Sequence, residues 1–97
     1  MVPFEWDGWA MDALRKDIEP YEVRQVLEAT VRWPRPATTD TGKRVLSIWA
    51  RTRAGRPLIV TTYHHDGLIW KIIGASEMNF TQLAEFEAWE ELRHDQP

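Results

Sequence analysis

The chain contains no cysteine, and this excludes disulfide bonds, thiolate catalysis and zinc sites built on thiolate ligands. It also lacks any run of eighteen apolar residues, and its first sixteen residues show no basic start that leads into an apolar stretch. We therefore expect a soluble, cytoplasmic protein that does not associate with a membrane. The 97 residues, of which 43% are hydrophobic, fit one domain over residues 1–97.

Catalytic motifs with a strong local signature are absent as well. The five glycines form no phosphate-binding loop, and the chain has neither a nucleophile elbow nor a Cys/His pair. His64 and His65 are adjacent on an expected strand, so their side chains point to opposite faces and do not share one metal ion. We therefore expect no metal and no other cofactor, and take His64 as a candidate general acid or base.

Tryptophan, in contrast, is abundant. One small core cannot easily enclose all six side chains, so we expect one or two on a surface, at a contact with a protein partner or with a second copy of the chain. The six residues are Trp6, Trp9, Trp33, Trp49, Trp70 and Trp89.

Charge is segregated along the chain, although the formal net charge is only −3. Residues 1–31 carry seven acidic and three basic side chains, and residues 57–97 carry seven acidic and two basic ones. Residues 32–56 between them carry seven basic and one acidic side chain. Because local charge steers a polyanion more than net charge does, the middle third is the candidate nucleic-acid surface.

The helical signals lie at the two ends of the chain. We expect two N-terminal helices, the first capped by Asp7 and the second starting at Pro20. Asn79 and Gln82 form a capping box, which predicts a C-terminal helix from there, and the glutamates between its apolar positions are typical of a solvated face.

The strand signals lie between the helices. Residues 31–44 contain two prolines and an Asp-Thr-Gly turn signal and read as a loop or an edge strand. Residues 44–53, 57–64 and 68–75 read as consecutive antiparallel strands, the last two joined by a turn at Asp66-Gly67. The expected fold is thus α+β, with two N-terminal helices, a meander of three to four strands and a C-terminal helix.

The turn between the first two of these strands concentrates arginine. Strand alternation places Trp49, Arg51 and Arg53 on one face, with Arg56 just beyond the turn. An aromatic ring among arginines can stack a base while the guanidinium groups bind phosphates. The alternative is a solvated, charged sheet face that blocks edge-to-edge pairing.

Four stretches together resemble the BrnT-type toxin family, small ribonucleases of bacterial toxin–antitoxin modules with a RelE-like fold. The stretches are "FEWD" at 4–7, "LRKDIEPYEVRQVL" at 14–27, "ARTRAGRPLIVTTY" at 50–63 and "WKIIGASEM" at 70–78. The resemblance implies a toxin that inhibits translation by cleaving RNA without a metal, and an antitoxin protein as its partner.

In such enzymes basic side chains stabilise the charge of the transition state as the ribose 2′-hydroxyl attacks. The resemblance implies basic site residues at Arg44, Arg51, Arg56 and Lys71, and the residue pattern itself adds His64, Trp49 and Arg53. The catalytic candidates are Arg51, Lys71 and His64; the RNA-binding candidates are Arg44, Trp49, Arg53 and Arg56.

Other positions depart from the family pattern. Asp17 stands where the pattern has a histidine, and Ser76, followed by Glu77, stands where it has an arginine. In the last helix, Gln82 and Phe86 stand where the pattern has a glutamate and a tyrosine. The departures leave a second hypothesis open, a catalytically degenerate module that binds a protein partner or nucleic acid. A third is a homo-oligomer built on tryptophan contacts.

Overall fold

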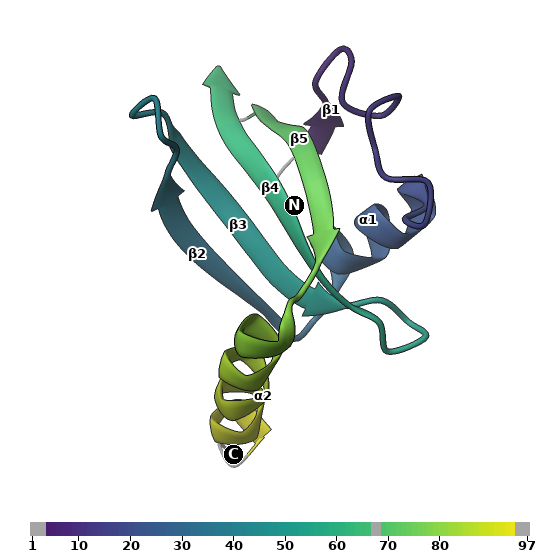
Figure 1. Ribbon diagram of the computed structural model, residues 1–97, viewed down its shortest axis with the longest axis vertical. Helices are drawn as coiled ribbons and strands as arrows, with labels where there is room; N and C mark the ends of the chain where they lie inside the picture. Colours follow the sequence, from purple (N-terminus) through teal and green to yellow (C-terminus); the bar gives the residue numbers. More distant parts are fainter. Residues whose placement is uncertain (1–3, 67–68, 95–97) are drawn as a thin grey trace.

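The computed structural model describes residues 4–66 and 69–94, which form an α+β fold of five strands and two helices (Figure 1). The elements, in chain order, are β1 (Phe4–Trp6), α1 (Pro20–Glu28), β2 (Arg32–Thr38), β3 (Arg44–Arg51), β4 (Pro57–Asp66), β5 (Ile69–Glu77) and α2 (Phe80–His94). In the described residues, no helix is long and apolar enough to cross a membrane.

The five strands form one sheet in the order β1-β5-β4-β3-β2. Strands β2 to β5 are an antiparallel meander, as expected, although the predicted Asp66-Gly67 turn extends outside the described residues. The stretch read as a loop or an edge strand is the edge strand β2. Pro34 and Pro36 suit an edge, because alternate residues of an edge strand point their N–H groups to solvent and a proline has none to lose.

The structure differs from the predicted fold in two places. The first expected helix is a series of turns over residues 8–13, in which Ala10 N–H bonds the Asp7 carbonyl and Leu14 N–H bonds the Met11 carbonyl. Nucleating a helix is costly, and this segment buries little apolar surface to offset the cost. The second difference is β1, a strand that was not predicted. It pairs parallel to β5, with Phe4 beside Trp70 and Trp6 beside Ile72.

Helix α1 covers one face of the sheet. Pro20 occupies its first turn, and the Glu22 carboxylate accepts the Glu19 N–H at 3.0 Å, which satisfies one of the free donors there. The apolar stripe of Val23, Val26 and Leu27 is buried. It packs in one core cluster with alternate residues of β3 and β4 and with Ile72 of β5; those of β3 and β4 are Ile48, Ala50, Leu58 and Val60.

Helix α2 packs on the other face, at the end of the sheet where β5 stops (Figure 1). The capping box is present: Gln82 N–H donates to Asn79 Oδ1 at 2.8 Å, and Asn79 N–H donates to Gln82 Oε1 at 2.9 Å. The side chains of α2 that face the sheet are Leu83, Phe86 and Trp89, and they contact a cluster formed by Trp33, Trp49, Ile59 and Met78. The far half of α2 extends beyond the strands.

Candidate functional site

The turn between β3 and β4 is a compact loop that holds an arginine at each end. Thr52 N–H bonds the Arg56 carbonyl and Gly55 N–H bonds the Thr52 carbonyl, both at 2.9 Å. The Arg56 N–H donates to the Thr52 hydroxyl at 3.1 Å, and Thr52 is buried. Gly55 has φ +95°, a conformation that side chains disfavour. The loop therefore positions Arg51 and Arg56 rigidly.

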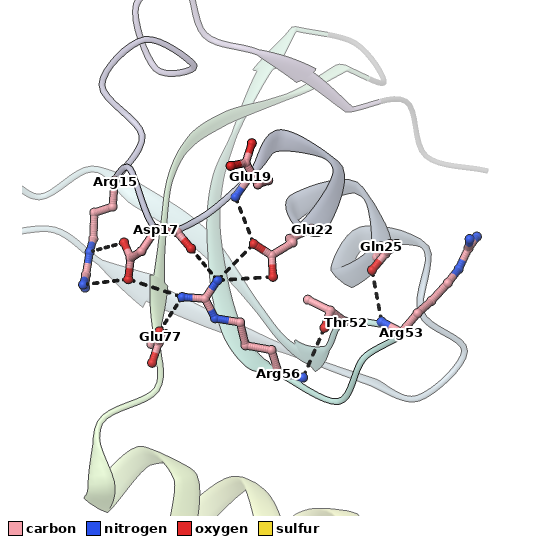
Figure 2. Close-up of polar contacts among 9 residues, drawn as sticks. All are labelled: Arg15, Asp17, Glu19, Glu22, Gln25, Thr52, Arg53, Arg56 and Glu77. Atoms are coloured by element: carbon pink, nitrogen blue, oxygen red, sulfur yellow. Dashed lines mark hydrogen bonds and ion pairs between the residues drawn. The ribbon is translucent and has the colours of Figure 1, made fainter.

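Arg56 lies at the centre of a cluster of carboxylates (Figure 2). Its Nη1 donates to both oxygens of the buried Glu22, at 3.0 and 3.2 Å, and to the Asp17 carbonyl. Its Nη2 contacts Glu77 Oε1 and lies 3.3 Å from Asp17 Oδ2. Arg15 holds Asp17 from its other side through two bonds of 3.1 Å. One guanidinium thus neutralises groups from the segment before α1, from α1 and from the end of β5.

Three of the four stretches that carry the family resemblance meet at this cluster. Asp17 and Glu22 come from the stretch at 14–27, Arg56 from 50–63 and Glu77 from 70–78. Asp17, which departs from the family pattern, and Glu77, which follows the departing Ser76, both bind Arg56. The two guanidinium groups of the cluster, of Arg15 and Arg56, lie among three carboxylates, so its net charge is negative and it repels a phosphate rather than attracting it.

Arg51 forms a second ion pair, with α2. Its Nε and Nη2 each bond one oxygen of Glu90, both at 2.9 Å, in a bidentate pair. Its Nη1 donates to the Gly55 carbonyl at 3.1 Å, and Glu87 lies 3.9 Å from Nη2. These contacts occupy the N–H groups of Arg51 that would otherwise donate to a phosphate.

The pKa values of both arginines respond to these pairs. The hydrogen bond to Glu90 raises the pKa of Arg51 above its usual value. The hydrogen bond to Glu77, followed by that to Glu22, raises the pKa of Arg56. Both guanidinium groups are therefore held in the charged form, and neither is prepared for proton transfer.

The structure does not bring the three catalytic candidates together. Arg51 of β3 lies beside Pro57, at the start of β4. Lys71 of β5 lies beside Tyr63, which is six residues further along β4 and therefore about 20 Å from Pro57. Lys71 Nζ forms an ion pair with Glu5 of β1 at 3.0 Å. His64 pairs with Trp70, on the face that α1 covers, with the two ring centroids 5.1 Å apart. The three residues are therefore not one active centre in this structure.

The RNA-binding candidates are also dispersed. Trp49, expected to stack a base, is only 7% exposed and packs edge-on against Trp33. Arg44 is exposed at the far end of β3, and Arg53 is exposed in the turn, where its N–H donates to Gln25 Oε1. Across residues 4–66 and 69–94, no ion pair involves Arg44 or Arg53. With Arg56 enclosed by carboxylates, two separate arginines remain.

The carboxylates that pair with Arg35, Arg51 and Arg56 are site residues that the sequence analysis did not predict. A signal for them was present, because the basic middle third is flanked by two acidic thirds. In the structure Arg56 takes its counter-ions from both flanks, and Arg51 and Arg35 take theirs from α2, Arg35 through Glu85 at 2.8 Å. Of the seven basic side chains in residues 32–56, these three thus have carboxylate partners among the described residues, and Arg32, Lys43, Arg44 and Arg53 do not.

Two hollows lie on the described surface. One of about 310 Å³ lies beside the turn and is lined by polar groups, among them Arg51, Arg53 and Glu90. The other, of about 720 Å³, lies between α1 and the face of the sheet that α1 covers, and Phe4, Trp6 and Trp70 give it an apolar wall. Within the described residues, no three histidine, aspartate or glutamate side chains are placed to hold a metal ion. Comparison of the chain with models of known protein families and with curated proteins gives no match.

Proposed function

We propose that this protein is a catalytically degenerate, toxin-like module that acts by binding a partner protein. One observation supports this proposal: Arg51, Arg56 and Lys71 each form an ion pair with at least one carboxylate. A phosphate would have to break these pairs, and it would approach carboxylates that repel it. The arrangement therefore favours the non-catalytic hypothesis over the ribonuclease hypothesis.

A protein suits this surface better than RNA does as the ligand. Two of the three arginines of the β3–β4 turn, Arg51 and Arg56, are already paired with carboxylates, so the electrostatic attraction that dominates nucleic-acid binding is weakened there. Large apolar side chains, in contrast, stand in solvent: Phe80 is 91% and Leu92 68% exposed. The partner that the family resemblance implies, an antitoxin protein, is one candidate for this role.

The first test expresses the chain alone in bacteria and incubates the purified protein with RNA in a metal-free buffer. We expect normal growth and intact RNA. Growth arrest with RNA cleavage that Arg51→Ala or Lys71→Ala abolishes would overturn the proposal and establish the ribonuclease.

The second test looks for the partner. The chain is co-expressed with the protein encoded by the neighbouring gene, and the mass of the purified species is measured by light scattering. We expect a complex that persists at high salt, since a contact dominated by apolar groups is little screened. A complex with RNA that dissociates steeply with salt would replace the protein partner with nucleic acid.

A further inference from the structure

Helix α2 carries apolar side chains on two opposite faces. Its inner face packs on the sheet through Leu83, Phe86 and Trp89. Its outer face carries Phe80 and Leu92, the most exposed large apolar side chains among the described residues, at 91% and 68%. Ala84 and Ala88 are exposed between them. An ordinary surface helix has one apolar stripe that faces the core, so the second stripe of α2 needs another explanation.

The four outer residues form one continuous strip, called here the outer stripe: Phe80, Ala84, Ala88 and Leu92. Their spacing of four residues places each above the one before on a helix. The two alanines at its centre leave room for a second helix to approach closely, and the two large side chains can pack around its ends.

The charges beside the outer stripe identify the kind of partner. Glu85 and Glu90 are used by Arg35 and Arg51. Glu87 and Glu91 lie three residues after Ala84 and Ala88, so they border the stripe. Glu91 forms no ion pair with any residue in the described part of the chain, and Glu87 only a 3.9 Å contact with Arg51. The border is therefore acidic.

We propose that the outer stripe of α2 docks a basic amphipathic helix of the partner protein; this inference rests on the proposed function. Apolar side chains of that helix cover Phe80 and Leu92, and its lysines or arginines pair with Glu87 and Glu91. A second copy of the same helix fits less well, because it would bring glutamates against glutamates.

The helix is held in place before it binds. The Arg51–Glu90 and Arg35–Glu85 pairs fix it to the sheet, and Trp89 stacks on Trp33 with ring centroids 5.2 Å apart. An anchored helix loses little conformational entropy on binding, which favours affinity.

The test uses two synthetic helical peptides with the same leucine and alanine pattern, one flanked by lysine and arginine and one by glutamate. Binding to the full chain is measured by fluorescence anisotropy. We expect the basic peptide alone to bind, and the Phe80→Ser/Leu92→Ser variant to weaken it by about tenfold or more. Glu91→Lys should weaken the basic peptide and strengthen the acidic one.

Matched controls separate the outer stripe from general stickiness. Trp9 and Tyr21 are exposed to nearly the same degree as Leu92 but lie on other elements. The Trp9→Ser/Tyr21→Ser variant should bind the basic peptide as the unaltered protein does, and circular dichroism should show the same helix content in both double variants. Equal loss in both, or no binding of the basic peptide, overturns the inference.

Two further outcomes also overturn it. A dimer that Phe80→Ser/Leu92→Ser converts to a monomer would assign the stripe to a second copy. A complex with the partner protein that survives the same variant would place docking elsewhere while leaving the proposed function standing. Failure of the proposed function itself is visible separately, as RNA cleavage by the unaltered chain.

Discussion

The two arginines that flank the β3–β4 turn, Arg51 and Arg56, lie five residues apart and make different connections. Arg51 joins the turn to α2 through one bidentate pair with Glu90. Arg56 joins it to Asp17, to Glu22 of α1 and to Glu77 at the end of β5. One hairpin therefore connects both layers of helices to the sheet. A local cluster of arginines has become two structural contacts rather than one binding site.

Burial distinguishes the two contacts further. The side chains of Arg56 and Glu22 are 23% and 12% exposed, whereas those of Arg51 and Glu90 are 33% and 28% exposed. Screening by water weakens the more exposed pair. The Arg56 cluster should therefore contribute more to stability than the Arg51–Glu90 pair does.

The largest effect is expected for Arg56→Ala. This change leaves Glu22 buried without its partner, and it should lower the free energy of unfolding by about 3 kcal/mol. Arg56→Lys should lose less, because it keeps the charge but not the planar fork. Urea unfolding measures both. A loss no larger than that of Arg44→Ala, which removes an exposed side chain, would contradict the comparison.

A smaller effect is expected for Gly55→Ala, which strains the turn between the two arginines. An added Cβ at Gly55 meets no atom within 4 Å, so the cost comes from its φ of +95° and should be about 1–2 kcal/mol. Gly42 is a matched control with φ +85° and equally open surroundings. Gly42→Ala should cost the same but leave the Arg51–Glu90 coupling unchanged, whereas Gly55→Ala should weaken it. Equal coupling in both variants would show that the turn does not position Arg51.

A third prediction concerns the Arg51–Glu90 pair itself. A double-mutant cycle of Arg51→Ala and Glu90→Ala should give a coupling energy of about 1 kcal/mol at low salt, and less at high salt. Thermal or urea unfolding of the four proteins measures it. A coupling energy near zero would mean that Trp89 and Phe86 alone hold α2 on the sheet.

The smallest effect is expected from pH. Glu90 raises the pKa of Arg51 in the folded protein, so from neutral pH upward the stabilisation stays complete below the unfolded pKa of Arg51 and is lost only as pH rises through the folded one. The coupling energy should therefore be the same at neutral pH and at about pH 10. With Arg51→Lys it should start to fall there, because the ordinary pKa of lysine is about 10.4. A fall in both proteins would assign the change to another group.

Much of the fold could be predicted because its signals are local. Pro20 and the Asn79–Gln82 capping box act within three or four residues, so they locate the starts of α1 and α2. Alternation in β3 puts Ile48 and Ala50 on the face opposite Trp49, and the structure places them in separate apolar clusters. The expected helix after Asp7 failed since its few apolar residues satisfied the pattern without enough burial to offset nucleation.

The candidate site was less predictable than the fold. The arginines are close together in the sequence, but the partners of Arg56 and Arg51 lie 34, 21 and 39 residues away along the chain, at Glu22, Glu77 and Glu90. Trp49 alternates with the arginines as a stacking residue would, yet α2 covers it. A local sequence pattern cannot predict which side chains a distant helix will cover.

By itself, the sequence determined where charge of each sign lies, which residues are apolar at helix or strand spacing, and that thiol chemistry is excluded. Only the tertiary structure decided that Arg35, Arg51 and Arg56 of the basic third pair with carboxylates of both acidic thirds, and that β1 joins the edge of β5. The reason is physical: a helix start depends on neighbours a few residues away, whereas a counter-ion depends on the path of the whole chain.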